Sequence, residues 1–422
     1  MTEQMKLSRG RAHERRSEFD AKARALAGAA SLPTRPYKKT GFPLPAWASF
    51  YADDRALAVL VCSGEQWRTV EKALAYGIAH AQDRKLELVI PEHRQGKRNP
   101  VQATLVRAAF LRTDIQLWTH DGNTARPREP LDPREACRLL QEDALRGGEL
   151  DLKDLAWQVT ELENWADSQP GLTACHEKSH QTWRCQGQIL LSIQRHGKGL
   201  LVKSGVHYSK QIRGKSLPDS LPLIDRSLNP AELSKITARV QAGISDKQSG
   251  RSQGSREHWM QATLARHTAQ IGWSGSHRLE REFPAKRPGG GTAYIDFLRM
   301  DDSGILHIIE TKIGHDEMLV LQGLDYWIWA QANAKLLADH FKVHATRMVG
   351  VDYVVGPKDG KQDLAGGEKA VLSPYAPAQL EALGNEIDWQ VHLCTGWATS
   401  SPVMTPLGAR TVPAAPYVHH RT

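Results

Sequence analysis

Two apolar runs and the turn between them decide the fold of the second half of this chain. The runs read Ala293-Tyr-Ile-Asp-Phe-Leu298 and Ile305-Leu-His-Ile-Ile-Glu-Thr-Lys-Ile313, and Met300-Asp-Asp-Ser-Gly304 lies between them. Runs rich in β-branched and aromatic residues, joined by a cluster of Asp, Ser and Gly, are typical of a β-hairpin. The sequence therefore predicts two antiparallel strands over residues 292–299 and 305–313.

Three charged residues are set into this apolar hairpin: Asp296, Glu310 and Lys312. Side chains of a strand alternate between its two faces, so Glu310 and Lys312 share a face. A carboxylate between Ile and Phe is costly unless it is paired or binds a cation. Two carboxylates beside an ammonium suit Mg²⁺ or Mn²⁺, which prefer oxygen ligands and leave room for phosphate. The alternative is an ordinary buried salt bridge of Lys312 with either carboxylate.

The pattern Asp296…Glu310-Thr-Lys312 resembles the core motif of the PD-(D/E)XK nuclease superfamily, although Ile295 stands where many members have Pro. Gln322-Gly-Leu-Asp-Tyr326 is similar to the Gln-x-x-x-Tyr motif of RecB-like members, and residues four apart share one helix face. Context gives the motif its specificity, because the same Asp-x-Lys spacing recurs elsewhere in the chain without ending a long apolar strand. Examples are Asp20-Ala-Lys22, Asp151-Leu-Lys153 and Asp359-Gly-Lys361.

The resemblance implies a set of metal ligands. Asp296 and Glu310 would hold one or two Mg²⁺ (or Mn²⁺) ions, and the carbonyl of Thr311 would be a further oxygen ligand. Glu257, on the preceding helix, stands where many members of the superfamily carry an extra acidic ligand. A metal held there would activate water and stabilise charge on a scissile phosphate.

The resemblance also implies roles for residues that do not bind metal. Lys312 would position or polarise the attacking water and offset negative charge in the transition state. Gln322 and Tyr326 would steady the site or contact the substrate backbone. Further basic residues are candidate nucleic-acid contacts: Arg281, Lys286, Arg287, Lys198 and Lys203.

Length and composition bound the class of protein. The 422 residues allow two or three domains, and 40% are hydrophobic and 24% charged, as in globular proteins. A net charge of +8 favours polyanionic partners. The sequence has no 18-residue apolar run and no apolar signal-peptide core, so we expect no membrane span. Five scattered cysteines favour a reducing, cytoplasmic setting.

Residues 51–170 are predicted to form a small Rossmann-like α/β domain with a helical extension. Strands alternate with helices, which indicates a parallel sheet. The expected strands are 56–62, 86–90 and 114–118, and the expected helices are 65–82, 101–111, 134–145 and 152–167. The turn at Ser63-Gly-Glu65 lacks a dinucleotide fingerprint. Arg94, Lys97 and Arg98 would still suit a phosphate, so a nucleotide ligand stays open beside a scaffolding or DNA-handling role.

The other segments outside the nuclease-like region have simpler predictions. Residues 1–50 are a basic arm and Pro-rich linker that would either follow a DNA backbone or be solvated. Residues 171–244 contain a basic β-hairpin over 182–194 and 199–208, and a helix over 230–243. The hairpin would either touch nucleic acid or have only a structural role. Residues 245–255 are Gly/Ser-rich and predict a flexible linker, and residues 397–422 predict a disordered tail.

The Cys and His residues of the middle region do not predict a zinc site. Cys175, His176, His180 and Cys185 match the spacing of no common zinc finger.

Residues 256–396 are predicted to form a restriction-endonuclease-like αβββαβ core, making the chain an α/β protein. The expected elements are a helix over 256–271, strands over 279–283, 292–299 and 305–313, a helix over 315–340, a strand over 348–355, a helix over 378–383 and a strand over 389–394. Pro288-Gly-Gly-Gly291 precedes the Asp296 strand. Its glycines would either let DNA approach or form a loose turn.

The sequence therefore predicts a Mg²⁺-dependent deoxyribonuclease that hydrolyses phosphodiester bonds, and restriction, repair and defence against phage all fit. One alternative is a nuclease gated by a nucleotide that the N-terminal domain senses. Another is a non-catalytic nucleic-acid-binding protein, as in superfamily members that have lost chemistry. A homodimer or larger complex stays open.

Overall fold

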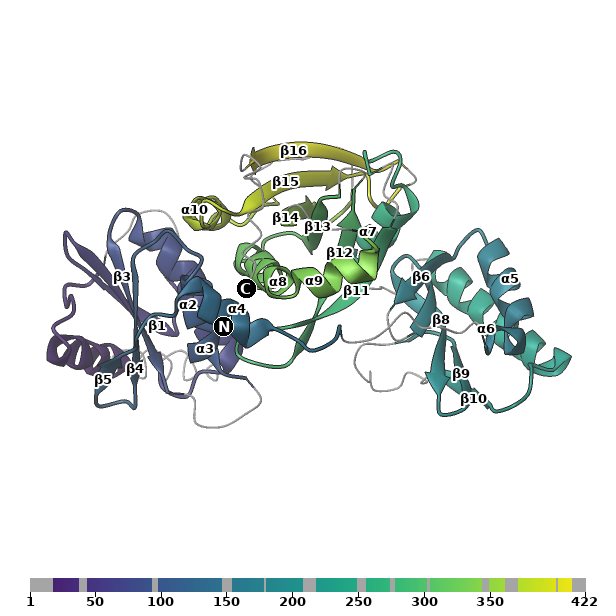
Figure 1. The fold of residues 1–422 in the computed structure, drawn as a ribbon, viewed down its shortest axis with the longest axis horizontal. Coiled ribbons are helices and arrows are strands. Elements are labelled where there is room, and N and C mark those ends of the chain that lie inside the picture. The colour runs from purple at the N-terminus through teal and green to yellow at the C-terminus, as the bar shows by residue number, and fades with distance from the viewer. Residues whose placement is uncertain are drawn as a thin grey trace, which may run out of the picture.

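The structure is a computed structural model of the chain. It describes residues 18–37, 44–92, 98–145, 154–177, 180–207, 218–248, 256–273, 278–301, 304–343, 349–360, 371–399 and 401–411. Within these residues the strands form a five-stranded sheet and an eleven-stranded sheet, with helices packed against both (Figure 1). The chain is therefore an α/β protein, as the sequence predicts.

The five-stranded sheet belongs to the N-terminal part and runs in the order β1-β2-β3-β4-β5. Its strands are β1 (Ala48–Ala52), β2 (Ala56–Val61), β3 (Lys85–Pro91), β4 (Ile115–His120) and β5 (Ala125–Pro127). The three central strands are parallel, as expected, while β1 and β5 add antiparallel edges that the sequence did not predict.

A central parallel sheet needs cover on both faces, and this one has it. Leu57 and Val59 of β2 pack with α2 (Trp67–Ala81) and with α3 (Pro100–Ala108), while Ala58 and Leu60 pack with the helix over residues 18–29. Residues 1–17 of the predicted basic arm lie outside the described residues.

The eleven-stranded sheet runs in the order β10-β9-β8-β7-β6-β11-β12-β13-β14-β15-β16. Its strands are β6 (Thr173–Glu177), β7 (His180–Cys185), β8 (Gln188–His196), β9 (Gly199–Ser204), β10 (Asp219–Leu223), β11 (Arg278–Lys286), β12 (Thr292–Met300), β13 (Leu306–Ile313), β14 (Val349–Gly356), β15 (Asp388–Thr395) and β16 (Val403–Arg410). Strands β12 and β13 form the predicted antiparallel hairpin, and β13, β14 and β15 are parallel. The middle region joins this sheet through β6, which pairs with β11.

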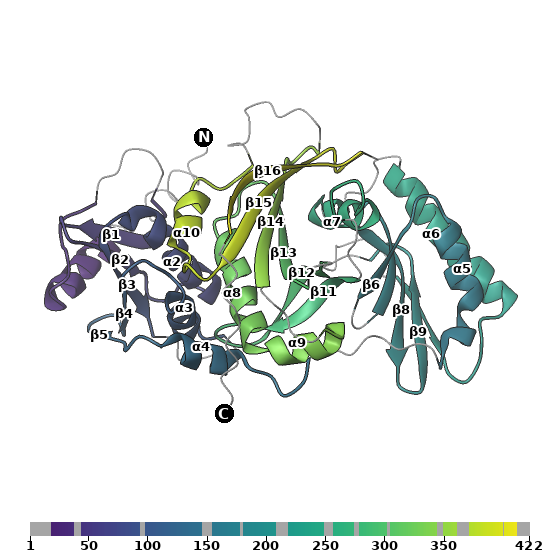
Figure 2. The ribbon, with the colours of Figure 1, turned by 45° about the horizontal axis from the view of Figure 1, so that its top comes forward.

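The remaining helices cover the larger sheet or connect the two sheets (Figure 2). They are α4 (Pro133–Leu140), α5 (Thr160–Ser168), α6 (Pro230–Gln248), α7 (Arg256–Arg266), α8 (Leu319–Ala332), α9 (Ala334–Phe341) and α10 (Ala376–Ala382). The predicted single helix over 315–340 is two helices, because Asn333 interrupts it. Its side-chain amide donates to Leu140 O at 3.1 Å and its side-chain oxygen accepts from Glu142 N at 2.9 Å.

The prediction of one long strand over residues 182–194 is wrong. These residues form a tight hairpin of β7 and β8. The two loop residues, Gln186 and Gly187, have φ values of 46° and 76°. Two consecutive positive φ angles are the geometry of the two-residue turn that best matches strand twist. A Cβ on Gly187 would lie 2.2 Å from Trp259 N, so glycine is also required for the contact with α7.

Four element boundaries also differ from the predictions. The predicted linker over 245–255 is helical as far as Gln248, and residues 249–255 lie outside the described residues. The predicted disordered tail contains β16, which pairs with β15. Helix α5 begins at Thr160 after a 3-10 turn over Ala156–Gln158, so the predicted start at 152 is wrong. Helix α7 ends at Arg266, not at 271.

Among the described residues, no helix is long and apolar enough to cross a membrane.

Candidate metal centre

The β12–β13 hairpin brings the first three predicted site residues together. The paired residues of the two strands end at Phe297↔Ile309, and Asp296 and Glu310 are the next residues on each strand. One carboxylate oxygen of Asp296, Oδ2, accepts from Thr311 N at 2.8 Å and from Thr311 Oγ1 at 2.7 Å. The backbone of β13 therefore fixes the carboxylate of β12.

Lys312 lies among three carboxylates from three different segments. Its ammonium nitrogen is 3.4 Å from Glu257 Oε1, 3.9 Å from Glu310 Oε1 and 3.9 Å from Asp316 Oδ2. Burial lowers the pKa of Lys312, but the neighbouring carboxylates outweigh burial and raise it, so the ammonium stays charged. Glu257 thus reaches the site from α7. Asp316 is a member that sequence reasoning missed, although it stands four residues after Lys312.

Glu310 is the most buried carboxylate of the group, with 4% of its surface exposed. Burial raises its pKa well above the ordinary value, and the charge of Asp296 raises it further. Its second oxygen, Oε2, is buried and has no hydrogen-bond partner in the described part of the chain. A buried carboxylate oxygen without a partner is costly, and a bound cation would satisfy it.

The donors at this site fit a hard divalent cation. Burial raises the pKa of Asp296 and of Glu257 as well, so each carboxylate is destabilised in its charged form until a cation compensates it. No group of three or more His, Cys, Asp or Glu side chains among the described residues is already placed to hold a metal. Mg²⁺ is commonly bound by one or two carboxylates together with waters and substrate phosphates, so Asp296 and Glu310 would be a sufficient set of protein ligands.

Two buried residues hold Thr311 in place. Gln261 of α7 donates from Nε2 to Thr311 Oγ1 at 3.0 Å, and Arg281 donates from Nη2 to Gln261 Oε1 at 3.1 Å. Arg281, a predicted phosphate contact, is 4% exposed and lies over the Phe297 ring. The structure therefore places Arg281 in a chain of contacts that ends at Asp296. Sequence reasoning missed Gln261, although it stands one helical turn after Glu257.

The strand ladder is interrupted opposite Asp296. The neighbouring pairs Arg281↔Phe297 and Phe283↔Ile295 place Glu282 across from Asp296. These two residues do not themselves form a β-ladder pair. Glu282 has a φ of 48°, a left-handed conformation that is unusual for glutamate and is often found at functional sites. Its side chain pairs with Arg184 Nη2 at 3.0 Å.

The same arginine reaches the start of α7. Arg184 Nη1 lies 2.8 Å from His258 Nδ1, next to Glu257 in the sequence. Strand β7 of the middle region thus contacts the helix that carries one of the site carboxylates.

The Gln-x-x-x-Tyr residues lie on α8 beside this group. Gln322 Oε1 is buried and has no hydrogen-bond partner among the described residues. Tyr326 donates its hydroxyl to Tyr294 O at 2.9 Å. Burial raises the pKa of Tyr326 well above the ordinary value, and the charges of Glu310 and Asp296 raise it further. The phenol is therefore a neutral donor that fixes β12 two residues before Asp296.

The remaining predicted nucleic-acid residues pair with groups other than the site carboxylates or lie in another part of the sheet. Arg287 pairs with Glu71 at 3.1 Å, and Lys286 Nζ is 3.4 Å from Gln141 O. Lys198 and Lys203 belong to the β8–β9 hairpin, which β7, β6 and β11 separate from β12 in the sheet. Their contact with nucleic acid stays a prediction.

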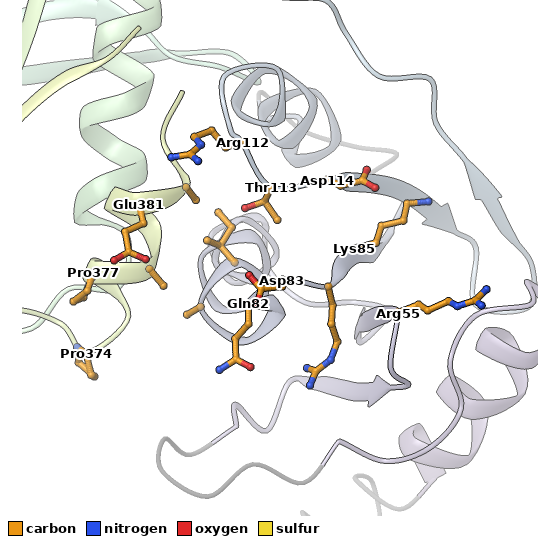
Figure 3. Close-up of a pocket in the computed structure, with 15 residues that line it drawn as sticks. Arg55, Gln82, Asp83, Lys85, Arg112, Thr113, Asp114, Pro374, Pro377 and Glu381 are labelled. Atoms are coloured by element: carbon orange, nitrogen blue, oxygen red, sulfur yellow. The ribbon is translucent and has the colours of Figure 1, made fainter. Parts of the chain in front are cut away.

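A large hollow of about 1270 Å³ lies elsewhere, between the five-stranded sheet and α10 (Figure 3). Arg55, Lys85 and Asp114 line it where the parallel strands begin, and Glu381 lines it from α10. Ligands of parallel sheets bind at the opposite edge, where strands end. The hollow is lined by none of the predicted site residues, so its size does not make it the candidate site.

Comparisons with known proteins give one weak structural match. No family model matches the chain, and no curated protein matches it. A solved structure of Pyrococcus furiosus SfsA in complex with Ca²⁺ is weakly similar, with 13% sequence identity over 56% of this chain and 93% of that chain. Its TM-score is 0.17, so the likeness carries no argument about the site. The chain is an α/β protein, and its membership of the PD-(D/E)XK superfamily stays a prediction from its residues.

Proposed function

We propose that this protein is a metal-dependent nuclease that hydrolyses phosphodiester bonds of nucleic acid, with DNA as the expected substrate. The observation that carries the proposal is the group around Lys312. Its ammonium lies within 4 Å of three carboxylates, one of which has a buried oxygen without a hydrogen-bond partner in the part of the chain that the structure describes. A salt bridge alone would leave that oxygen unsatisfied, whereas a divalent cation would complete it.

Different residues of the site would have different roles in phosphodiester hydrolysis. Asp296, Glu310 and the carbonyl of Thr311 would hold Mg²⁺ or Mn²⁺, which when bound would activate water and stabilise charge on the phosphate. Lys312 would orient the attacking water and offset negative charge that develops in the transition state. Glu257 would orient the Lys312 ammonium, which it contacts at 3.4 Å.

Other side chains would keep these groups in position. Gln261 and Arg281 hold Thr311, and Thr311 holds Asp296 through two hydrogen bonds. Tyr326 restrains β12 through Tyr294 O. This arrangement supports the resemblance to PD-(D/E)XK nucleases, and a nuclease of this kind would serve in restriction, repair or defence.

The test is cleavage of plasmid, linear duplex and single-stranded DNA in Mg²⁺, Mn²⁺ or EDTA. Wild type is compared with Asp296→Ala and with Asp339→Ala, a control at an exposed aspartate of α9. We expect metal-dependent cleavage by wild type and the control, and none by Asp296→Ala. Equal cleavage by Asp296→Ala, or no cutting in any metal, would contradict the proposal and favour a protein that only binds nucleic acid.

A further inference from the structure

Three guanidinium groups surround one indole ring at the junction of the two sheets. The Cζ atoms of Arg98, Arg68 and Arg287 lie 5.0, 5.1 and 5.8 Å from the centroid of the Trp67 ring. Trp67 and Arg68 begin α2, Arg98 precedes α3, and Arg287 is in the turn between β11 and β12. Cation–π attraction stabilises each pair, but it does not neutralise the charge of three cations.

The carboxylates nearby are too few to balance these cations. Glu71 and Asp325 pair with Arg287 at 3.1 and 3.5 Å and with the buried Arg107 at 3.1 and 2.7 Å. No carboxylate of the described residues lies within 4.0 Å of Arg98, and Arg68 is exposed to solvent.

This leaves an uncompensated positive charge at a partly buried position. Counting Arg107, four guanidinium groups of the described residues lie beside two carboxylates of the described residues, an excess of two positive charges. Burial lowers the pKa of Arg98, and so do the positive charges of Arg287 and Arg68, while Glu71 and Asp325 raise it without reversing the shift. A bound anion would relieve this repulsion.

The residues before α3 and the turn between β11 and β12 are joined by hydrogen bonds that hold the cluster together. Arg98 Nη1 donates to Gly290 O at 2.5 Å, and Asn99 N donates to Gly289 O at 2.7 Å. A Cβ on Gly289 would lie 2.3 Å from Asn99 O. The glycines of the Pro288-Gly-Gly-Gly291 turn therefore allow the backbone before α3 to approach closely.

Strand β12 connects the cluster to the candidate metal centre. From Arg287 the chain enters β12, where Tyr294 and Asp296 are two residues apart and so face the same side. Tyr294 is 57% exposed, an unusual exposure for an aromatic ring. Tyr326 contacts Tyr294, and its pKa responds both to Glu310 and to Arg287. Tyr326 of α8 thus contacts the strand that leads from the cluster to Asp296.

We propose that Arg68, Arg98 and Arg287, held around Trp67, bind backbone phosphates of the nucleic acid whose scissile phosphate lies at the metal centre. The exposed ring of Tyr294 offers a stacking face for a base between the two places. This inference rests on the proposed function and extends it, because the N-terminal sheet becomes part of the substrate-binding surface. A free nucleotide carries the same phosphate chemistry, so the test must separate the two sources.

The test measures binding of fluorescein-labelled single-stranded and duplex DNA by fluorescence anisotropy in EDTA, from 50 to 200 mM KCl, with the full chain. Arg68→Gln and Arg98→Gln are compared with Arg126→Gln, a control at an exposed arginine of β5. Loss of one phosphate contact lowers the slope of log affinity against log salt by about 0.7–0.9. We expect that decrease for both variants, no change for the control, and at least about fivefold weaker single-strand binding for Tyr294→Ala.

Three outcomes would contradict the phosphate-binding inference or the proposed nuclease function, and they show which of the two fails. Slopes of Arg68→Gln and Arg98→Gln equal to the control would overturn the inference, even if Asp296→Ala loses cleavage and the nuclease stands. Saturable ATP binding that Arg98→Gln abolishes, with unchanged DNA slopes, would assign the cluster to a free nucleotide and also overturn it. Lower slopes together with full cleavage by Asp296→Ala would support the cluster and contradict the proposed function.

Discussion

Removal of the Arg107 side chain should destabilise the protein strongly. Arg107 of α3 is fully buried and donates from Nε to Asp325 Oδ1 and from Nη2 to Oδ2, both at 2.7 Å. Its Nη2 is also 3.1 Å from Glu71. Arg107→Met would leave two buried carboxylates with Arg287 as their nearest cation. Breaking a buried ion pair in this way costs about 3–5 kcal/mol, which is the decrease we expect in the free energy of unfolding.

Asp325→Leu should cost a similar amount, because it leaves Arg107 buried and short of one partner. The double variant removes both charges and keeps the pair of Glu71 with Arg287. We therefore expect it to lose clearly less than the sum of the single variants, with a coupling energy near the upper end of the roughly 0.5–3 kcal/mol seen for contacting residues.

The assay is urea unfolding, followed both by tryptophan fluorescence and by circular dichroism, because a chain with two sheets need not unfold in one step. Arg138→Met, at an exposed arginine of α4, is the matched control and should change stability by less than about 0.5 kcal/mol. The reasoning is refuted if Arg107→Met loses less than about 1 kcal/mol, or if the two single effects add in the double variant.

Three smaller predictions concern the surroundings of the site and the middle region. Gly323→Ala would place a Cβ 2.5 Å from the Tyr353 ring, so we expect a loss of about 1–3 kcal/mol and a lower Tm, and an unchanged Tm would contradict this close contact. Burial lowers the pKa of His307, but its hydrogen bond and charge interaction with Asp352 outweigh burial and raise it. The stability that His307 contributes should therefore be complete below its ordinary pKa and be lost as pH rises through the raised one. The difference in urea midpoint between wild type and His307→Gln should accordingly be larger at pH 5.5 than at pH 9, and a constant difference would argue against the charged pair. Asn229 accepts from the first turn of α6, so Asn229→Ala should cost about 1 kcal/mol while Asn229→Asp keeps the cap, which thermal melts would compare.

The β12–β13 hairpin and its charged residues could be predicted because their determinants are local. The two apolar runs and the turn between them lie within about twenty residues, and the antiparallel register follows from the turn. Asp296 and Glu310 therefore had to come close together in any such hairpin. The parallel strands of the N-terminal sheet were equally visible, since buried parallel strands read as continuous apolar runs.

The β7–β8 hairpin and strand β16 could not be predicted because their sequence signals are weak. Gln186-Gly187 is not a typical turn pair, so β7 and β8 read as one strand. Strand β16 lies in a segment rich in Pro and Thr, which favours disorder by composition. Its Pro406 is tolerated because β16 is an edge strand and pairs with His392 beside a register shift.

The contacts that complete the site come from segments far apart in the sequence. Gln261 and Arg281 each look like ordinary polar residues of a helix and a strand, and only the fold joins them to Thr311. The arginine cluster is similar, because Arg68 and Arg287 are separated by more than two hundred residues. No spacing rule connects such residues, so only the packing of the N-terminal sheet against the β11–β12 turn reveals them.

The most direct test of the central claim is the rate at which Lys312→Ala cleaves labelled DNA in Mg²⁺ or Mn²⁺, measured beside wild type. Binding of the same DNA in EDTA is measured for each protein, and Lys335→Ala, an exposed lysine of α9, serves as control. The account predicts at least about a hundredfold slower cleavage with binding affinity within about threefold of wild type. A Lys312→Ala protein that cleaves at the wild-type rate would contradict the assignment of this site as the nuclease centre.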